Sequence, residues 1–160
     1  MNILIMDMGD DLRGESRIPG YGDKIELLSF SHGVAMQMSG DISSQDRTAG
    51  KPNHMDLTVT KYLDVVSPTL NQACCQGKVF PKVELIVGRN DNANVVEFMR
   101  YTIKGVVISS ISVGGDGGDG PIETVTLNYN HITWKFTSQS EHGAPRVVEG
   151  KWDLEKNRAS

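Results

Sequence analysis

The chain has 160 residues, with 16 basic and 20 acidic side chains and a formal net charge of -4 at pH 7. It contains no run of lysine or arginine that could follow a phosphate backbone, so we expect no nucleic acid partner. No stretch approaches about 18 consecutive apolar residues, and the start MNILIMDMGDDL lacks the basic region of a secretion signal. We therefore expect neither direct membrane insertion nor a signal peptide.

A chain of this length fits one domain, which we expect to cover residues 1–160. Its only cysteines, Cys74 and Cys75, are neighbours in the sequence and cannot link distant segments. We expect both to act as small, partly buried hydrophobic side chains in a reducing compartment, with a redox pair as the alternative.

Residues 25–34, IELLSFSHGV, predict a strand with an unusual polar face. Leu28 and Phe30 share one of its faces, which we expect to pack against the core. The opposite face is small and wettable, and it consists of Ser29, Ser31 and Gly33. Such a face suits either a water-filled channel or an ordinary solvent-facing surface.

The segment MQMSGDISSQDRTAGKPN, residues 36–53, shows no apolar period. It is longer than the roughly 12–15 residues that compact domains usually allow for a connection. We therefore expect a long loop that is either disordered or ordered by a partner.

Period-two patterns predict further antiparallel strands at residues 54–64, at 83–87 and at 95–113. The third run exceeds the usual strand length of about 5–6 residues, so we expect Gly105 to bend or bulge it. The residues expected to face inward include Met55, Leu57, Val59 and Leu63 in the first run and Val83, Leu85 and Val87 in the second.

One segment, SPTLNQACCQG at residues 67–77, predicts a helix. Ser67 can cap it, Pro68 fits the first helical position, and Gly77 can end it. The apolar face has i, i+3, i+4 spacing and consists of Leu70, Ala73 and Cys74.

The run at residues 122–136 changes its apolar phase without a turn signal, from Val125 and Leu127 to Trp134 and Phe136. This predicts a bulged strand that passes from one sheet to a second. A flexible, hairpin-like glycine connection precedes it at 114–120, and a last strand is predicted at 146–154. With roughly seven or eight strands, the predicted fold is mainly β, a compact antiparallel two-sheet β-barrel with one short α-helix.

No pattern predicts an enzyme, a metal site or a cofactor. GGDGGDGPI matches the first six positions of a calcium-binding nonapeptide, but a single copy with Pro121 at an apolar position cannot complete the coordination shell. No serine lies in G-x-S-x-G, and Glu15 is expected to be a solvated loop acid rather than half of a catalytic carboxylate pair. The four histidines lack metal-ligand spacing. We expect surface or strand-face positions for His32, His54, His131 and His142.

Five segments, spread in order over nearly the whole chain, carry a resemblance. They are GES at 14–16, IELLSFSHGV at 25–34, TKYLDVVSPTLNQACCQGK at 60–78, VVISSISVGGDGG at 106–118 and GKWDLEKN at 150–157. Together they resemble the Hcp family, the haemolysin-coregulated proteins of bacterial type VI secretion. The third segment is the most specific of the five.

The resemblance implies hexameric rings that stack into the inner tube of a contractile injector, within its sheath. It also implies contact with a VgrG-type spike protein, and ring lumens that receive and protect small effectors. Export then runs from the bacterial cytoplasm through the machine itself. On this interpretation the serine face of residues 25–34 borders the channel, with Ser31 as the best single candidate for cargo contact. The long loop resembles the family's extended loop, which reaches neighbouring subunits. The candidates for such contacts in this chain are Met38, Asp41, Asp46, Arg47 and Lys51.

The sequence departs from common members of the family in its turn residues IPGYG, at 18–22, and at His32, where a tryptophan is frequent. These departures bear on the choice of effector more than on the ring. The alternatives are a monomeric β-sandwich binding module, for example for carbohydrate, and a hydrolase. The first would usually offer a cluster of exposed aromatic residues, but the chain has only 2 Trp, 4 Tyr and 4 Phe, and most lie in core phase. For the second we find no nucleophile, base or metal set.

Overall fold

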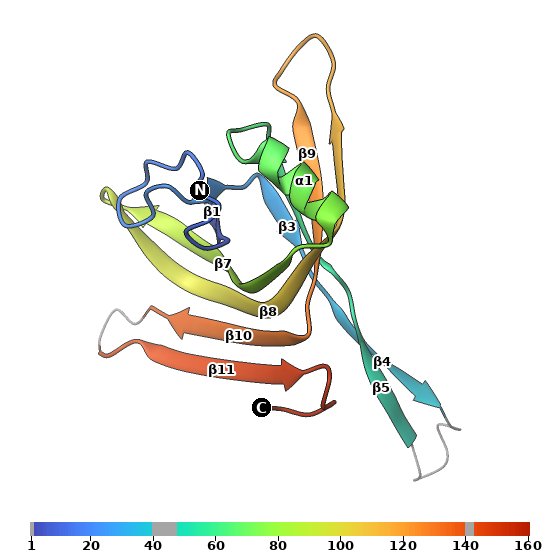
Figure 1. The fold of residues 1–160 in the computed structure, drawn as a ribbon. Coiled ribbons are helices and arrows are strands. Elements are labelled where there is room, and N and C mark those ends of the chain that lie inside the picture. The colour runs from blue at the N-terminus through green and yellow to red at the C-terminus, as the bar shows by residue number, and fades with distance from the viewer. Residues whose placement is uncertain (1, 40–47, 140–142) are drawn as a thin grey trace.

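The computed structural model of the chain describes residues 2–39, 48–139 and 143–160 (Figure 1). These ranges contain eleven strands and one helix. In chain order they are β1 (Asn2–Asp7), β2 (Ile25–Glu26), β3 (Ser29–Ser31), β4 (Val34–Ser39), β5 (Thr48–His54), β6 (Leu57–Tyr62), α1 (Ser67–Gln76), β7 (Val79–Asp91), β8 (Asn94–Gly114), β9 (Ile122–Asn128), β10 (His131–Ser138) and β11 (Arg146–Asp153).

Nine of the strands form one antiparallel sheet, and β4 and β5 form a second, two-stranded sheet. The large sheet has the order β2-β1-β7-β8-β9-β6-β3, and β10 and β11 extend it from β8. Figure 1 shows this sheet curling, with α1 beside β8 and β9 and with the β4–β5 hairpin projecting away from the rest. The predicted mainly β fold with two sheets and one short helix is therefore confirmed.

Strand β8 changes its neighbour at Gly105. Its first part pairs with β10 up to Lys104, and its second part pairs with β9 from Val107 onward. Gly105 has a φ of 59°, in the left-handed region that favours glycine, and a Cβ there would overlap the side-chain amide of Asn130. The bend predicted at Gly105 is confirmed.

The change of phase predicted within residues 122–136 is confirmed at the connection between β9 and β10. Val125 and Leu127 point into the core from β9, and Ile132 does so from β10. Both strands nevertheless belong to the same sheet, because the long β8 pairs with each of them in turn. The predicted passage to a separate sheet is therefore wrong.

The helix covers the predicted residues, but Ser67 does not cap it. Val66 occupies the N-cap position without a side-chain cap, and Ser67 is the first helical residue. The Ser67 hydroxyl instead donates to the buried carboxylate of Glu123 at 2.8 Å. At the other end Gly77 adopts a φ of 63° and closes the helix, as predicted.

Residues 36–53 are not a structureless loop, and that prediction is wrong for the part that is described. The strands β4 and β5 pair from Val34 with His54 to Ser39 with Thr48. No period-two signal is present in residues 36–53, because no described side chain of this ribbon belongs to the core cluster and burial therefore imposes no alternation. Asp41, Asp46 and Arg47 lie outside the described residues.

The core is one cluster of buried side chains, drawn from β1, β2, β6 to β10 and α1. Leu57, Val59, Val83, Leu85 and Val87 are buried as predicted. Three residues expected to face inward are exposed instead, by 42%, 56% and 46%, because they lie where the chain enters or leaves a strand. They are Leu28, Met55 and Leu63.

The cysteines differ in their surroundings. Cys74 packs partly against the core, whereas Cys75 is exposed, contrary to expectation. The chain forms more strands than predicted, because β1 was not predicted, residues 25–34 are divided into β2, β3 and the start of β4, and most of β4 and β5 lies in residues predicted as a loop. Among the described residues, no helix is both long enough and apolar enough to span a bilayer.

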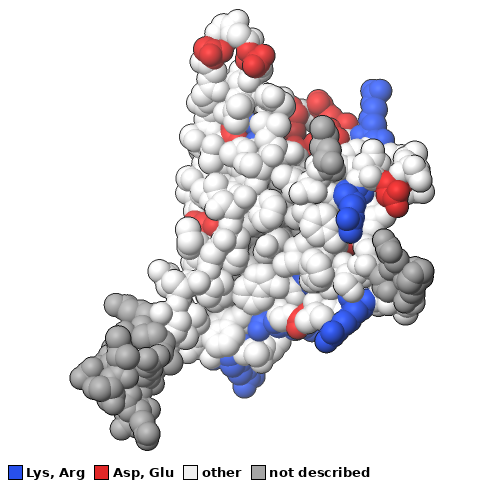
Figure 2. All heavy atoms as spheres, turned by 180° about the vertical axis from the view of Figure 1, so that it is seen from behind, with Lys and Arg blue, Asp and Glu red and all other residues white. Residues whose placement is uncertain are grey.

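The glycine-rich residues 114–120 connect β8 to β9 as the tip of a long hairpin, as expected. Seen from behind, in Figure 2, the tip carries acidic side chains. They are Asp116 and Asp119, both exposed. Asp116 Oδ1 accepts a hydrogen bond from the Gly118 N–H at 2.8 Å, the geometry of a local turn.

Candidate functional site

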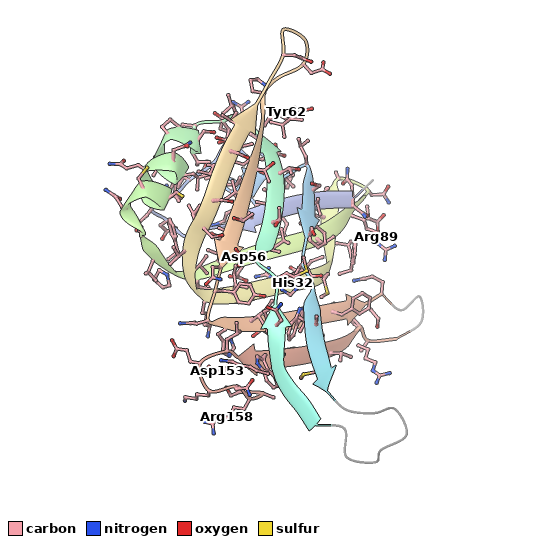
Figure 3. All side chains as sticks on the ribbon, turned by 90° about the vertical axis from the view of Figure 1, so that its right-hand side faces the viewer. His32, Asp56, Tyr62, Arg89, Asp153 and Arg158 are labelled. Atoms are coloured by element: carbon pink, nitrogen blue, oxygen red, sulfur yellow. The ribbon has the colours of Figure 1, made fainter. Side chains whose placement is uncertain are left out.

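The outer side of β3, β6, β9 and the second part of β8 is formed mainly by serine and threonine, with the exposed Tyr62 and Ile122 at one end, and we name its serine and threonine residues the hydroxyl face. Figure 3 turns this side toward the viewer, with Tyr62 near one end of it and Asp56 and His32 near the other. It arises because alternate residues of β6 and β9 point into the core and leave hydroxyl residues outside. The hydroxyl face consists of Ser29, Ser31, Thr58, Thr60, Ser109, Ser110, Ser112, Thr124 and Thr126.

The strand register aligns these hydroxyls in two rows across four strands. The rows are Ser29, Thr60, Thr124, Ser112 and Ser31, Thr58, Thr126, Ser110. Two pairs of neighbours within the rows bond to one another, since the side-chain oxygens of Ser29 and Thr60, and those of Ser110 and Thr126, lie 2.5 Å apart. No member of either row carries a charge.

A bulge in β8 adds one more hydroxyl. The register of β8 against β9 shifts between Ile108 and Ser110, so Ser109 is an extra residue on the same face. Its hydroxyl donates to Asp56 Oδ2 at 2.6 Å, and Asn128 Nδ2 donates to Asp56 Oδ1 at 3.0 Å. Asp56 thus places one carboxylate at the end of the uncharged hydroxyl rows.

Two of the three predicted channel residues lie on the hydroxyl face, and the third does not. Ser29 and Ser31 are exposed and lie in the two rows, beside threonines that the prediction did not include. Gly33 lies outside β3, at the base of the hairpin, where a Cβ would come within 2.8 Å of Met55 Sδ. It therefore serves a close approach of side chain to backbone rather than the open face. A signal for the missed threonines was present, since hydroxyl residues occupy the polar phase of the strands predicted at 54–64 and 122–136.

Beneath the hydroxyl face, on the core side of the same strands, lies a buried ion pair. Lys61 and Glu123 are opposite one another in β6 and β9, and Lys61 Nζ lies 2.7 Å from Glu123 Oε2. Lys61 is fully buried and also donates to Asp64 Oδ1 at 2.8 Å. Through Ser67 the network reaches the first residue of α1, so it fixes the helix against the sheet. The sequence analysis missed it, although both residues lie in the apolar phase of their strands.

The histidines were expected at the surface or on strand faces, and two of them instead lie in an aromatic cluster. His32 and His54 meet Tyr101, Tyr129, Trp134 and Trp152 where the β4–β5 hairpin leaves the large sheet. Burial lowers the pKa of both imidazoles. His131 bonds to the backbone oxygen of Ser160, and His142 lies outside the described residues.

The pKa of Tyr129, one of the two tyrosines in this cluster, is shifted as well. Burial, together with the negative charge of Asp56, raises the pKa of Tyr129 far above its ordinary value, so its hydroxyl stays protonated. In the part of the chain that the structure describes, no group of three His, Cys, Asp or Glu side chains is arranged to hold a metal ion.

Comparison with known proteins identifies close likenesses. The family model described as "Type VI secretion system effector, Hcp" matches residues 6–136. Protein hcp1 of Pseudomonas aeruginosa is 34% identical over 150 residues, which cover 92% of each chain. A solved type six secretion system protein superposes with a TM-score of 0.89 at 27% identity over the whole of both chains. Hcp1 from Salmonella typhimurium superposes with a TM-score of 0.82 at 22% identity over 99% of each.

The first two findings establish the family, and the two solved structures agree with the fold described above. The family match at residues 6–136 contains the first four of the five segments that carried the resemblance. This chain belongs to the Hcp family of type VI secretion proteins.

Proposed function

We propose that this protein forms hexameric rings that stack into the inner tube of a type VI secretion machine, and that the hydroxyl face lines the opening of each ring. The observation that supports this most is the pair of hydroxyl rows across four strands. A ring of identical copies needs a head-to-tail interface that closes, and a tube needs a second one that does not. The role is structural, and no catalytic step is assigned to it.

The chemistry of the hydroxyl face suits a passage for cargo. Each hydroxyl can donate one hydrogen bond and accept two, so the rows can bind water or the polar groups of many proteins. Because the rows carry no charge and no large apolar side chain, they hold such groups weakly and reversibly. Small effector proteins are the cargo that this surface fits.

The remaining partners follow from the tube. The stack would meet a VgrG-type spike protein at its end and a contractile sheath around it. The protein would be made in the bacterial cytoplasm and secreted through the machine together with the spike.

Replacing Ser31 with arginine is expected to leave ring formation intact and to reduce the amount of co-purified cargo by about tenfold or more, equivalent to about 1.4 kcal/mol. Ser31 is exposed, so the substitution should not disturb the core. Every subunit would place a charged side chain in the opening. Mass spectrometry of small proteins recovered with the tagged rings measures the effect.

Thr69→Arg is the matched control, since Thr69 is an exposed hydroxyl residue on α1, away from the hydroxyl face. It should retain cargo as the unmodified protein does. Equal cargo recovery with Ser31→Arg and Thr69→Arg would remove Ser31 from the passage.

Shortening the β4–β5 hairpin is expected to weaken ring stacking more than folding. An Asn-Gly turn can replace residues 37–51, because Met36 and Pro52 are already opposite one another. The change removes all five candidate contact residues, including the exposed Lys51 and the backbone position of Met38 in β4. Since no described side chain of the hairpin strands belongs to the core cluster, the melting temperature should change little.

Electron micrographs at equal protein concentration would count stacked against single rings. Stacks as frequent as those of the full chain would show that the hairpin does not make the contact between rings.

A further inference from the structure

The β4–β5 hairpin joins the rest of the molecule at one narrow base. Within the described part of the chain, β4 and β5 pair only with each other. At the base the two crossing segments pack together, since the Met55 N–H donates to the Gly33 oxygen at 2.9 Å. Whatever holds this base therefore sets the direction of the whole hairpin.

Two histidines lie at this base, one on each crossing segment. His32 precedes β4, and His54 is the last residue of β5. The ring of His54 stacks at 6.2 Å on Trp134 and at 6.5 Å on Trp152, with interplanar angles of 23° and 25°. These contacts connect the end of the hairpin to β10 and β11, which belong to the large sheet.

A hydrogen-bonded chain closes the other side of the base. The Tyr129 hydroxyl donates to the Met55 oxygen at 3.1 Å, and its oxygen lies 2.5 Å from His32 Nε2. His54 has no such partner. Both of its ring nitrogens are shielded from solvent and make no hydrogen bond to any described residue. A proton added to His54 would therefore be held without an acceptor.

Among the described residues, no carboxylate bonds to either imidazole, although the charge of Asp56 reaches the cluster at Tyr129. Tyr101 from β8 and Tyr129 after β9 face the pair, and both are neutral because burial raises the pKa of each hydroxyl. The residues facing it from β10 and β11 are the two tryptophans, which do not titrate. The carboxylate of Asp56 accepts its hydrogen bonds from Ser109 and Asn128.

We propose that His32 and His54 are a pH-sensitive anchor for the β4–β5 hairpin: neutral imidazoles hold its base in the aromatic cluster, and their protonation in mildly acidic solution releases it. The hydrogen bond between His32 Nε2 and the Tyr129 hydroxyl survives protonation. The loss of stability comes from placing two like charges in a partly desolvated cluster.

The direction with pH follows from the two lowered pKa values. Burial lowers the pKa of His54, and burial together with His54 lowers that of His32. The released hairpin therefore binds protons more readily than the anchored one. Anchoring is fully present above the ordinary histidine pKa of about 6.5 and is lost as the pH falls below it. If the hairpin contacts the next ring, as proposed above, tubes should separate into rings over the same range.

The chain contains 2 Trp, and both contact His54, so tryptophan fluorescence reports on the anchor directly. A titration of the full chain from pH 8 to 4.5 should show a change with its midpoint below about 6.5. His54→Phe keeps an aromatic ring and should reduce this change to the part that His32 contributes through Trp134, whereas His131→Gln, outside the cluster, should preserve it in full. Hydrogen exchange corrected for its intrinsic pH dependence should show severalfold weaker protection of β4 and β5 below the midpoint.

A flat titration, a midpoint at or above 6.5, or hairpin protection that does not change through the transition would each overturn the anchor. These readouts need no tube. If rings fail to form at any pH, the proposed function fails while the anchor is still tested.

Discussion

Replacing Lys61 with methionine is expected to lower the free energy of unfolding by about 3–5 kcal/mol. Lys61 is fully buried, and its ammonium group lies within 2.8 Å of the carboxylates of Glu123 and Asp64. Without it, the nearly fully buried Glu123 would be an uncompensated charge whose Oε1 already lacks a hydrogen-bond partner among the described residues. Because the free energy of unfolding of a domain is only about 5–15 kcal/mol, this one change removes a large share of the stability.

Urea denaturation of the single variant and of Lys61→Met/Glu123→Leu separates the lost charge from the lost volume. The double variant should regain most of the stability, since an apolar pair of similar size can replace a buried ion pair at little cost. A single variant within about 1 kcal/mol of the unmodified chain would show that the network contributes little, as exposed pairs do.

Replacing Gly105 with alanine is expected to cost about 2–4 kcal/mol, as the sum of left-handed backbone strain and overpacking. A Cβ at this position would overlap the Asn130 amide, so this side chain would have to leave its position and its hydrogen bond to Glu155 Oε1 at 3.2 Å. The bend at Gly105 lets β8 serve β10 and β9 in turn, so the variant should weaken both ladders.

Gly114→Ala is the control within the same strand, because a Cβ there meets nothing within 4 Å and its φ is not in the left-handed region. Its melting temperature should match that of the unmodified chain. Equal melting temperatures for both variants would contradict the account of the bend.

The sequence predicted best those features that follow from a burial period or from backbone chemistry. Val83, Leu85 and Val87 alternate because one face of β7 is in the core, and Gly77 ends α1 because it can adopt a positive φ. Gly105 was recognised for the same backbone reason.

Features that depend on partners distant in sequence were missed. Lys61 and Glu123 occupy apolar positions in two strands that lie far apart in the chain, and only their pairing makes burial possible. His54 is held by Trp134 and Trp152, which no spacing links to it. Ser67 was assigned to a cap because its distant partner Glu123 could not be foreseen.

The hydroxyl face was found only in part, for a related reason. Ser29 and Ser31 stood out because one strand had small residues in place of valine. The rows became visible only once β3, β6, β9 and β8 were placed side by side and in register. The pattern within one strand does not predict the order of strands in the sheet, so it cannot predict a surface formed by several strands.

Electron cryomicroscopy of the purified protein tests the central claim most directly. We predict closed hexameric rings in which the hydroxyl face, with Ser29 and Ser31, borders the central opening. The account would be contradicted by single subunits at high concentration. It would equally be contradicted by rings lined instead by the charged side of β7 and β8, where Arg100 pairs with Glu84 and Glu97.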